Sequence, residues 1–200
     1  DPPLISGAET LDVVLSSMFC DKAEHNQWLE ELIRYLPQRS DPPPPSPRLM
    51  VIGGENHDTS LLRLIEAQGA NIVVDDLCMG SRYFWNLTPS GSDPLLAIAS
   101  RYVDKPSCPV KDIGNTGTDI TQRPRYRHIL KLAQDYNVQG AFLVYQKFCH
   151  PQELDIPSLK KLFDQINLPT CVLELDTTLA EGPTKTRAQA FLEMMELDVV

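Results

Sequence analysis

Between Leu49 and Val74 the chain reads LMVIGGENHDTSLLRLIEAQGANIVV, an apolar run, an amphipathic stretch and a second apolar run. The two runs, 49–52 and 72–74, are apolar throughout, whereas a strand with one face in water alternates apolar and polar residues. Between them leucine and isoleucine recur at helical spacing up to Gly69, a common residue just past a helix end. This order predicts a strand, a helix and a second strand, with the two strands parallel and buried on both faces.

The same pattern continues toward the C-terminus. Apolar runs at 141–145 and 171–173 predict two more strands. Helical periodicity predicts helices over 58–68, 93–102, 123–136, 157–166 and 184–197, with starts near Asp58 or Thr59, Thr121, Pro157-Ser158 and Thr184. We therefore expect an α/β fold with a small doubly wound, four-stranded parallel sheet, Rossmann-like or flavodoxin-like, and helices on both faces.

Two segments precede this α/β region. Apolar residues at helical spacing predict two short helices within 8–36, interrupted near Cys20-Asp21. The following segment is rich in proline and offers few amide donors to a helix or a sheet. The expected division is an N-terminal helical appendage at 1–36, packed outside the sheet, a Pro-rich linker at 37–47 and an α/β domain at 48–200.

The 200 residues suffice for one sizeable hydrophobic core, and their charge excludes some functions. With 18 Lys and Arg against 27 Asp and Glu, the net charge is −9, which repels a phosphate backbone and argues against general nucleic-acid binding. No apolar run approaches the ~18 residues of a membrane span. The start at Asp1 shows no signal peptide and no initiator Met, so we expect a processed chain or a piece of a longer one. Five widely spaced cysteines without a CxxC pair indicate reduced thiols and a cytoplasmic location.

Polar side chains follow the predicted strands at their carboxyl ends, where ligands bind in open α/β sheets. Gly53-Gly54 lacks the GxGxxG spacing of a dinucleotide loop and is better explained as a tight turn before the next helix. Cys149, at the end of an apolar run, admits three interpretations from its residues alone. It is a buried free thiol, a nucleophile paired with the adjacent His150, or a metal or cluster ligand.

One basic cluster stands out in this acidic chain and comprises Arg123, Arg125, Arg127 and Lys131. A solvated helix face explains it, and contact with CoA phosphates or with a partner subunit is the alternative. Both interpretations stay open at the level of the sequence.

Five motifs occur in order within residues 48–195. They are Asp75–Arg82 (DDLCMGSR), Arg125 before a helix and a short strand, Lys147–Glu153 (KFCHPQE), Leu173–Asp176 (LELD) and Thr186–Phe191 (TRAQAF). In this order they resemble the C-terminal half of the 2-hydroxyacyl-CoA dehydratase / benzoyl-CoA reductase subunit family. The chain departs from the family pattern at His150, where Asp is usual, and at Pro183, where Gln is common. Both departures leave the substrate and the chemistry open.

The resemblance implies an iron–sulfur subunit that acts on a CoA thioester in anaerobic metabolism. Members of that family pair with a homologous second subunit as a heterodimer, hold a [4Fe-4S] cluster by three cysteines, and receive one electron from a separate ATP-dependent iron–sulfur activator protein. The dehydratases eliminate water from an (R)-2-hydroxyacyl-CoA through a ketyl radical, and this branch is the leading expectation here. The alternatives are a benzoyl-CoA reductase subunit, which partly reduces an aromatic ring, and a non-catalytic cluster-binding scaffold subunit.

The family's K-F-C-x-P motif makes Cys149 the implied metal ligand of the intact protein. The other two cysteine ligands are expected in an N-terminal half, so we predict no cluster and no activity for these 200 residues by themselves. The candidates for substrate-binding or cleft positions are Asp76, Cys78, Arg125, Lys147 and Arg187. Cys78 is expected near the site without being a ligand, and Cys108 in a connection that covers the cleft. The remaining cysteines, Cys20 and Cys171, are expected to be packed thiols.

Overall fold

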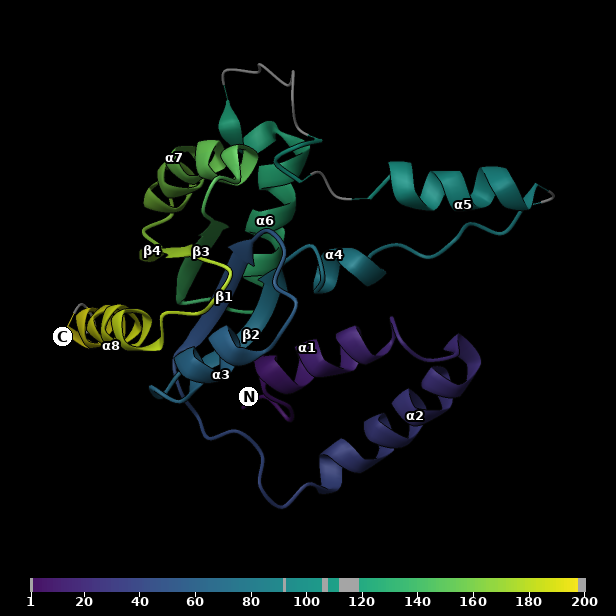
Figure 1. Cartoon of the computed structure of the whole chain (residues 1–200), viewed down its shortest axis with the longest axis horizontal. Coiled ribbons are helices and arrows are strands. Elements are labelled where there is room, and N and C mark those ends of the chain that lie inside the picture. The colour runs from purple at the N-terminus through teal and green to yellow at the C-terminus, as the bar shows by residue number, and fades with distance from the viewer. Residues whose placement is uncertain (1, 92, 106–107, 112–118, 198–200) are drawn as a thin grey trace.

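The computed structural model describes residues 2–91, 93–105, 108–111 and 119–197 (Figure 1). Its strands are β1 (Arg48–Gly53), β2 (Asn71–Asp76), β3 (Gly140–Gln146) and β4 (Thr170–Leu175). Its α-helices are α1 (Gly7–Ser16), α2 (Lys22–Tyr35), α3 (Ser60–Glu66), α4 (Ser81–Phe84), α5 (Pro94–Val103), α6 (Pro124–Asp135), α7 (His150–Asp164) and α8 (Glu181–Leu197). Two short 3-10 helices are η1 (Leu36–Gln38) and η2 (Ile120–Gln122). No helix within these described ranges is long and apolar enough to cross a lipid bilayer.

The four strands form one parallel sheet in the order β2-β1-β3-β4. Leu49 of β1 lies opposite Ile72 of β2 on one side and Gly140 of β3 on the other. Since the chain adds β2 on one side of β1 and then β3 on the opposite side, its winding direction reverses between β1 and β3. The predicted α/β class with a four-stranded, doubly wound parallel sheet is confirmed.

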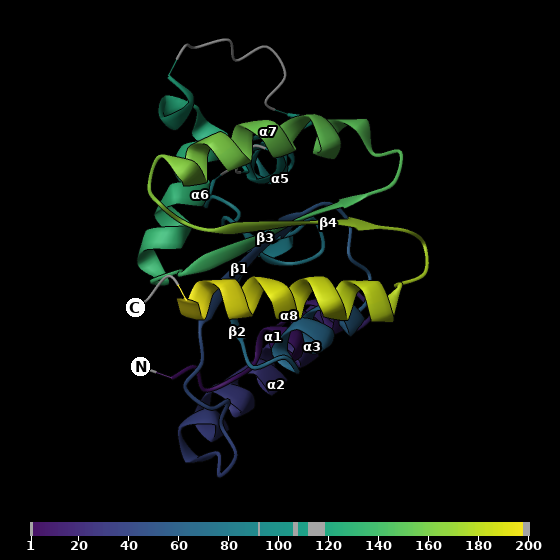
Figure 2. The same ribbon diagram turned by 90° about the vertical axis from the view of Figure 1, so that its left-hand side faces the viewer.

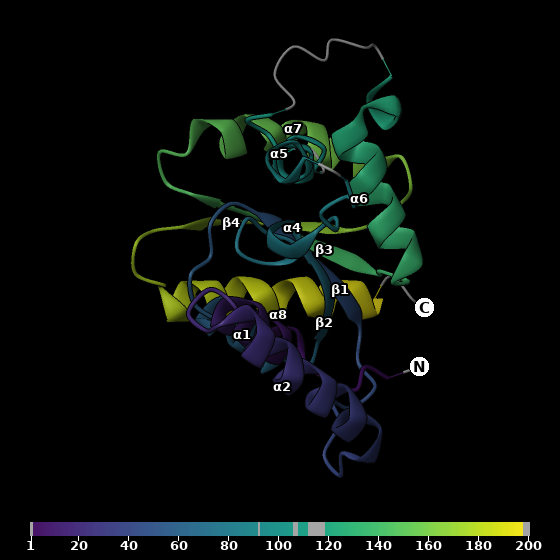
Figure 3. The ribbon, with the colours of Figure 1, turned by 90° about the vertical axis from the view of Figure 1, so that its right-hand side faces the viewer.

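Helices cover both faces of the sheet (Figures 2 and 3). One layer contains α1, α3 and α8, and the other contains α6 and α7. Alternate residues of β1 serve the two layers, because Leu49 and Val51 pack with the first and Met50 and Ile52 with the second. All four side chains are buried, which explains why the strand is apolar throughout.

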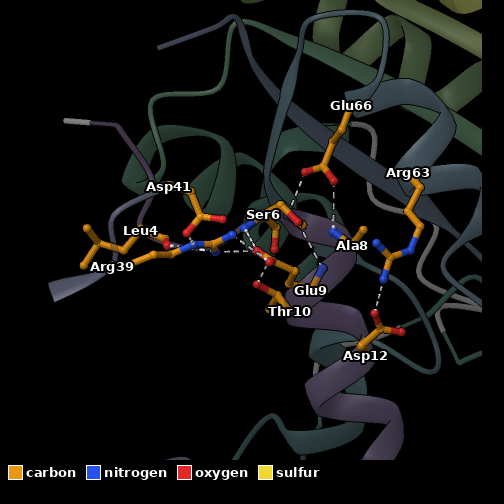
Figure 4. A network of polar contacts seen from close by, with 11 residues as sticks. Leu4, Ser6, Ala8, Glu9, Thr10, Asp12, Arg39, Asp41, Arg63 and Glu66 are labelled. Atoms are coloured by element: carbon orange, nitrogen blue, oxygen red, sulfur yellow. Dashed lines mark hydrogen bonds and ion pairs between the residues drawn. The ribbon is translucent and has the colours of Figure 1, made fainter. Parts of the chain in front are cut away.

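Helix α1 contributes to the hydrophobic core on one face of the sheet. Ala8 and Leu11 of α1 are buried among side chains of α3 and β2. The Glu66 carboxylate at the end of α3 accepts hydrogen bonds from the N–H groups of Gly7 and Ala8, at 2.7 and 3.2 Å (Figure 4). In α2, by contrast, only His25 is buried, so α2 lies outside this layer. The domain division at residues 36 and 47 stays a prediction.

Polar contacts join the Pro-rich segment to α1 (Figure 4). Arg39 forms an ion pair with Glu9 of α1 at 2.8 Å and another with Asp41 at 3.1 Å. The hydrogen bond from Arg39 lowers the pKa of Glu9. Farther along, the Asn71 side chain donates to the Pro44 carbonyl at 2.7 Å. The segment therefore runs along α1 and the start of β2 through these specific contacts.

The predicted starts of two helices are wrong. α7 begins at His150 and not at Pro157, because Pro151 occupies its first turn, where a missing amide N–H costs no helical hydrogen bond. Pro157 lies inside α7 on its exposed side, where water solvates the carbonyl that has lost its donor. α8 begins at Glu181, ahead of the predicted Thr184, and the short α4 was not predicted at all.

Candidate functional site

An open groove with a volume of about 570 Å³ lies at the carboxyl ends of β1, β3 and β4. The residues that line it follow those strands and are Glu55, His57, Gln146, Lys147, Phe148, Asp176 and Thr177. The winding of the sheet reverses between β1 and β3, and the segments after two such strands separate and leave a crevice. The groove therefore occupies the place where doubly wound α/β proteins bind ligands.

One exposed ion pair borders this groove. Lys147 Nζ donates to Asp176 Oδ2 at 2.8 Å, with both side chains about half exposed. The hydrogen bond raises the pKa of Lys147 and lowers the pKa of Asp176. Lys147, a predicted cleft residue, thus lines the groove, and its charge is balanced by an acid that the sequence analysis did not select.

Cys149 lies next to the groove, in the turn between β3 and α7. Phe148 before it has a left-handed backbone with a φ of 67°, and the Cys149 N–H donates to the Gln146 carbonyl at 3.0 Å. This tight turn makes Cys149 the partly exposed N-cap residue of α7. The role of Cys149 as a metal ligand stays a prediction.

Two glycines allow the close approaches that shape this edge of the sheet. A Cβ atom on Gly53 would lie 2.5 Å from the Val144 carbonyl oxygen, so the ends of β1 and β3 need glycine there. A Cβ atom on Gly80 would lie 2.1 Å from Asp75 Oδ1. That oxygen accepts two backbone N–H groups of the turn 77–81, at 2.9 and 2.8 Å. The close pairing of β1 with β3, as well as the expected turn, thus explains Gly53.

A buried charged network lies between β2, α6 and α7. The Arg125 guanidinium donates to Asp155 Oδ2 at 2.9 and 2.7 Å and to Asp76 Oδ2 at 3.1 Å. Asp155 also accepts a hydrogen bond from the Tyr126 hydroxyl at 2.7 Å. Burial by itself would lower the pKa of Arg125. The negative charges of Asp76 and Asp155 have the larger combined effect, so the pKa of Arg125 is raised.

Arg125 is therefore not part of a solvated helix face, and that interpretation of it is wrong. Its exposed fraction is 0%, so in this chain the guanidinium has no surface through which to touch a ligand. Asp76, another predicted cleft residue, is buried to the same extent. Neither residue is among those that line the groove.

Arg82 of α4 extends this network to the ends of two strands. Its Nη2 donates to the carbonyl of Gly53, at the end of β1, and to that of Asp76, at the end of β2. Two further nitrogens, Arg82 Nε and His128 Nε2, lie 3.5 and 3.9 Å from Asp76 Oδ1. Neither has a hydrogen-bond partner among the described residues. Burial lowers the pKa of His128, so its imidazole is neutral near pH 7.

The network positions the start of α7. Asp155 belongs to α7, and Gln152, about one turn earlier, is buried against Gly54 after β1. Arg125 thus joins α6 to α7 and, through Asp76, to β2. Because Cys149 caps α7, these contacts determine where its thiol lies relative to the groove. We describe Arg125 and Asp155 as positioning residues for Cys149.

Cys78 and Cys108 lie on the side of β2. Cys78 follows β2 in an exposed turn, and its backbone N–H donates to the Gly54 carbonyl at 3.1 Å. Partial burial of the thiol raises the pKa of Cys78, Arg82 opposes this effect, and the Cys108 thiol contributes to it. The two thiols are thus within electrostatic reach of each other. Pro106 and Ser107 of the expected cleft-covering connection lie outside the described residues.

Arg187 lies apart from the groove. It is an exposed residue of α8 and is not among the residues that line the groove. Its charge acts on the Tyr145 hydroxyl and the Cys171 thiol, which belong to β3 and β4. Burial raises the pKa of Cys171, and the residue packs against the α3 and α8 layer. Cys20 is half-buried at the turn between α1 and α2.

The described residues do not form a complete iron–sulfur site. Among them, no three His, Cys, Asp or Glu side chains converge closely enough to hold a metal ion. Cysteine side chains hold [4Fe-4S] clusters, and Cys149 by itself supplies one sulfur atom.

The sequence analysis missed Asp155, although a signal for it exists. Asp155 shares its face of α7 with the buried residues Leu159 and Leu162, and an acid within an apolar stripe indicates a buried partner. Placing the helix start at Pro157 removed Asp155 from that stripe. Because of this error in the helix boundary, Asp155 was not identified as the partner of Arg125.

These observations define a class, namely doubly wound α/β proteins with an open groove at the carboxyl edge of the sheet. Within that class, the chain belongs to the 2-hydroxyglutaryl-CoA dehydratase, D-component family, whose pattern it matches over residues 1–195. The family resemblance stated from the sequence motifs is thereby confirmed.

Three relatives show how much of such a protein the chain represents. The (R)-phenyllactyl-CoA dehydratase beta subunit of Clostridium sporogenes is 25% identical over 195 residues, which are 97% of this chain and 50% of that protein. The (R)-2-hydroxyglutaryl-CoA dehydratase subunit beta of Acidaminococcus fermentans is 24% identical over 196 residues, or 97% and 51%. The lactoyl-CoA dehydratase subunit beta of Anaerotignum propionicum is also 24% identical over 196 residues, or 97% and 50%. The chain thus spans about half the length of these relatives.

Proposed function

We propose that this chain is part of a subunit of a 2-hydroxyacyl-CoA dehydratase, the enzyme that eliminates water from an (R)-2-hydroxyacyl-CoA. The family match over residues 1–195 carries the proposal. We favour a dehydratase over a benzoyl-CoA reductase because the three relatives described above are all dehydratase subunits by name. In this proposal the carboxyl edge of the sheet faces the substrate.

Cys149 is, in this proposal, one thiolate ligand of a [4Fe-4S] cluster whose other ligands lie outside the described residues. Its position in the turn between β3 and α7, next to the groove, supports this role. When bound, such a cluster supplies one-electron chemistry. The buried pair of Arg125 and Asp155 holds the helix that carries the ligand.

The groove residues have a separate role. Lys147 and His57 offer hydrogen-bond donors in the groove, where the winding of the sheet reverses between β1 and β3, next to the turn of Cys149. A CoA thioester presents carbonyl and phosphate oxygens as acceptors for such donors. The remaining partners that we propose are a homologous second subunit and an ATP-dependent activator protein that delivers the electron.

Serine replacement of two cysteines tests the proposal. In the complete enzyme, prepared anaerobically, we expect Cys149→Ser to abolish the cluster signal in electron paramagnetic resonance and to lower the iron content, because oxygen replaces a soft sulfur ligand. The matched control Cys171→Ser, at a half-buried packing position, should leave both unchanged. A normal cluster signal in Cys149→Ser would overturn its role as a ligand.

A further inference from the structure

Three buried polar atoms from β2, α4 and α6 lie close together without forming a hydrogen bond. They are Asp76 Oδ1, Arg82 Nε and His128 Nε2, and none of them has a hydrogen-bond partner among the described residues. The two nitrogens lie 3.5 and 3.9 Å from the carboxylate oxygen. N–H···O hydrogen bonds span about 2.7–3.2 Å, so both distances are too long. An unpaired buried polar atom costs free energy, and each of the three therefore needs a partner.

The other contacts of these side chains hold the three atoms in place. Asp76 Oδ2 accepts a hydrogen bond from Arg125 at 3.1 Å, and Arg82 Nη2 donates to two backbone carbonyls at strand ends. The Trp85 ring packs edge-on with the His128 ring, and the two ring centres lie 4.8 Å apart. Moving Arg82 toward Asp76 Oδ1 would weaken its bonds to the strand ends. A direct contact between the three atoms is thus disfavoured.

The three side chains are closed off from bulk solvent. The exposed fraction of the side chain is 0% for Asp76, 6% for Arg82 and 13% for His128. Trp85, which packs against His128, belongs to the hydrophobic cluster of the α6 and α7 layer. A small molecule held between the three atoms would therefore exchange with solvent only when this part of the chain opens.

The hydrogen-bonding chemistry of the three atoms determines what they can bind together. Arg82 Nε is a donor and the Asp76 carboxylate is an acceptor. An anion cannot donate to Asp76, and a metal cation cannot accept from Arg82, so neither kind of ion satisfies both groups. A water molecule accepts two hydrogen bonds and donates two. It can serve both groups and also pair with the neutral imidazole of His128 in either tautomer.

We propose that Asp76, Arg82 and His128 bind one buried water molecule. Three hydrogen bonds are the usual number for a buried water. A water at hydrogen-bond distance from groups that are 3.5 and 3.9 Å apart lies beside the lines that join them. It connects α4 and α6 to the end of β2, in addition to the direct bonds of Arg82 and Arg125. The inference depends on contacts within the described chain and goes beyond the proposed function.

A crystal structure of the complete protein, at a resolution that shows ordered waters, tests the site directly. We expect one density peak within about 2.7–3.2 Å of both Arg82 Nε and Asp76 Oδ1. A direct bond between these two atoms with no peak beside them would overturn the proposal. An ion at this position, identified by its anomalous scattering, would overturn it as well.

Nuclear magnetic resonance tests the site in solution. In the isotope-labelled protein we expect the Arg82 Nε–H proton to show a dipolar cross peak to water, whose sign in a rotating-frame experiment separates it from chemical exchange. No such cross peak in the native sequence would overturn the proposal. This measurement needs no variant, so it decides the question even if a substitution prevents folding.

A pair of histidine variants tests the third partner. His128→Phe keeps a ring beside Trp85 but removes Nε2, so the buried water should exchange about fivefold faster, the equivalent of one lost hydrogen bond. Magnetic relaxation dispersion of water measures this rate. The matched control His150→Phe makes the same change at an exposed histidine and should leave the rate unchanged. Equal rates in His128→Phe and the native sequence would contradict a water held by three partners. None of these readouts depends on a cluster, so failure here leaves the proposed function standing.

Discussion

Two ion pairs in this molecule have similar geometry and opposite surroundings. Arg125 and Asp155 lie 2.7 Å apart with both side chains buried, whereas Lys147 and Asp176 lie 2.8 Å apart with both about half exposed. Removing one member of a buried pair leaves a charge in a medium that solvates it poorly, while water solvates an exposed survivor. Equal distances therefore conceal different roles. The buried pair holds α6 to α7, whereas the exposed pair lines the open groove.

The largest effect is expected for Arg125→Ala. It leaves Asp76 and Asp155 buried without their shared cation, so we expect a loss of about 3–5 kcal/mol in the free energy of unfolding. Urea denaturation followed by circular dichroism measures it. A loss below about 1 kcal/mol would show that water reaches the two carboxylates and would remove the contrast between the two pairs.

A smaller loss is expected for Asp155→Asn. The amide keeps the shape of the side chain and one acceptor oxygen, but Arg125 and Tyr126 lose a charged acceptor. We expect a cost of about 1.5–3 kcal/mol. A double-mutant cycle with Arg125→Ala measures the coupling between the two residues, and strict additivity would contradict a direct interaction.

A pH dependence is expected from His128 beside this network. Burial lowers its pKa in the folded chain, with Arg125 and Arg82 adding to this effect and Asp76 opposing it. Below the ordinary histidine pKa of about 6.5, His128 is protonated in the unfolded chain while it is still neutral in the folded chain. Stability should therefore fall as the pH drops from about 7 toward the lowered pKa of His128.

His128→Gln should remove this part of the slope. Between pH 7.5 and pH 5.5, the unfolding free energy of the native sequence should fall more than that of the variant. We expect the two decreases to differ by an amount on the order of 1 kcal/mol. The carboxylates titrate in both proteins and cancel in the comparison. Parallel slopes over this range would contradict a buried, neutral imidazole.

The smallest effect on stability is expected for Lys147→Ala. The ion pair with Asp176 is exposed, so the midpoint of thermal unfolding should not change measurably. In the complete enzyme the same variant should instead raise the KM for the acyl-CoA, because it removes a donor from the groove. A marked loss of stability with an unchanged KM would show that the exposed ion pair, like the buried one, stabilises the fold and does not bind substrate.

Much of the fold follows from local sequence patterns. The apolar runs predict all four strands and their burial on both faces, because residues 49–52 contain no polar position that would face water. The same runs place Lys147 at a strand end, where a parallel sheet collects its functional residues. Cys149 follows two residues later, and the order of five motifs, with K-F-C-x-P among them, indicates the family from sequence alone.

Only the tertiary structure decided the environment of the charged residues. The basic residues 123–131 look alike in sequence, yet Arg125 is fully buried, because Asp76 and Asp155, from 49 and 30 residues away, approach it in the folded chain. Pro157 indicates a helix start by local rules, but packing of the stripe that includes Asp155 continues the helix back to His150. Local patterns report which side chains avoid water. The partners of a buried charge depend on which distant segments meet after folding, and the local spacing of residues does not predict those contacts.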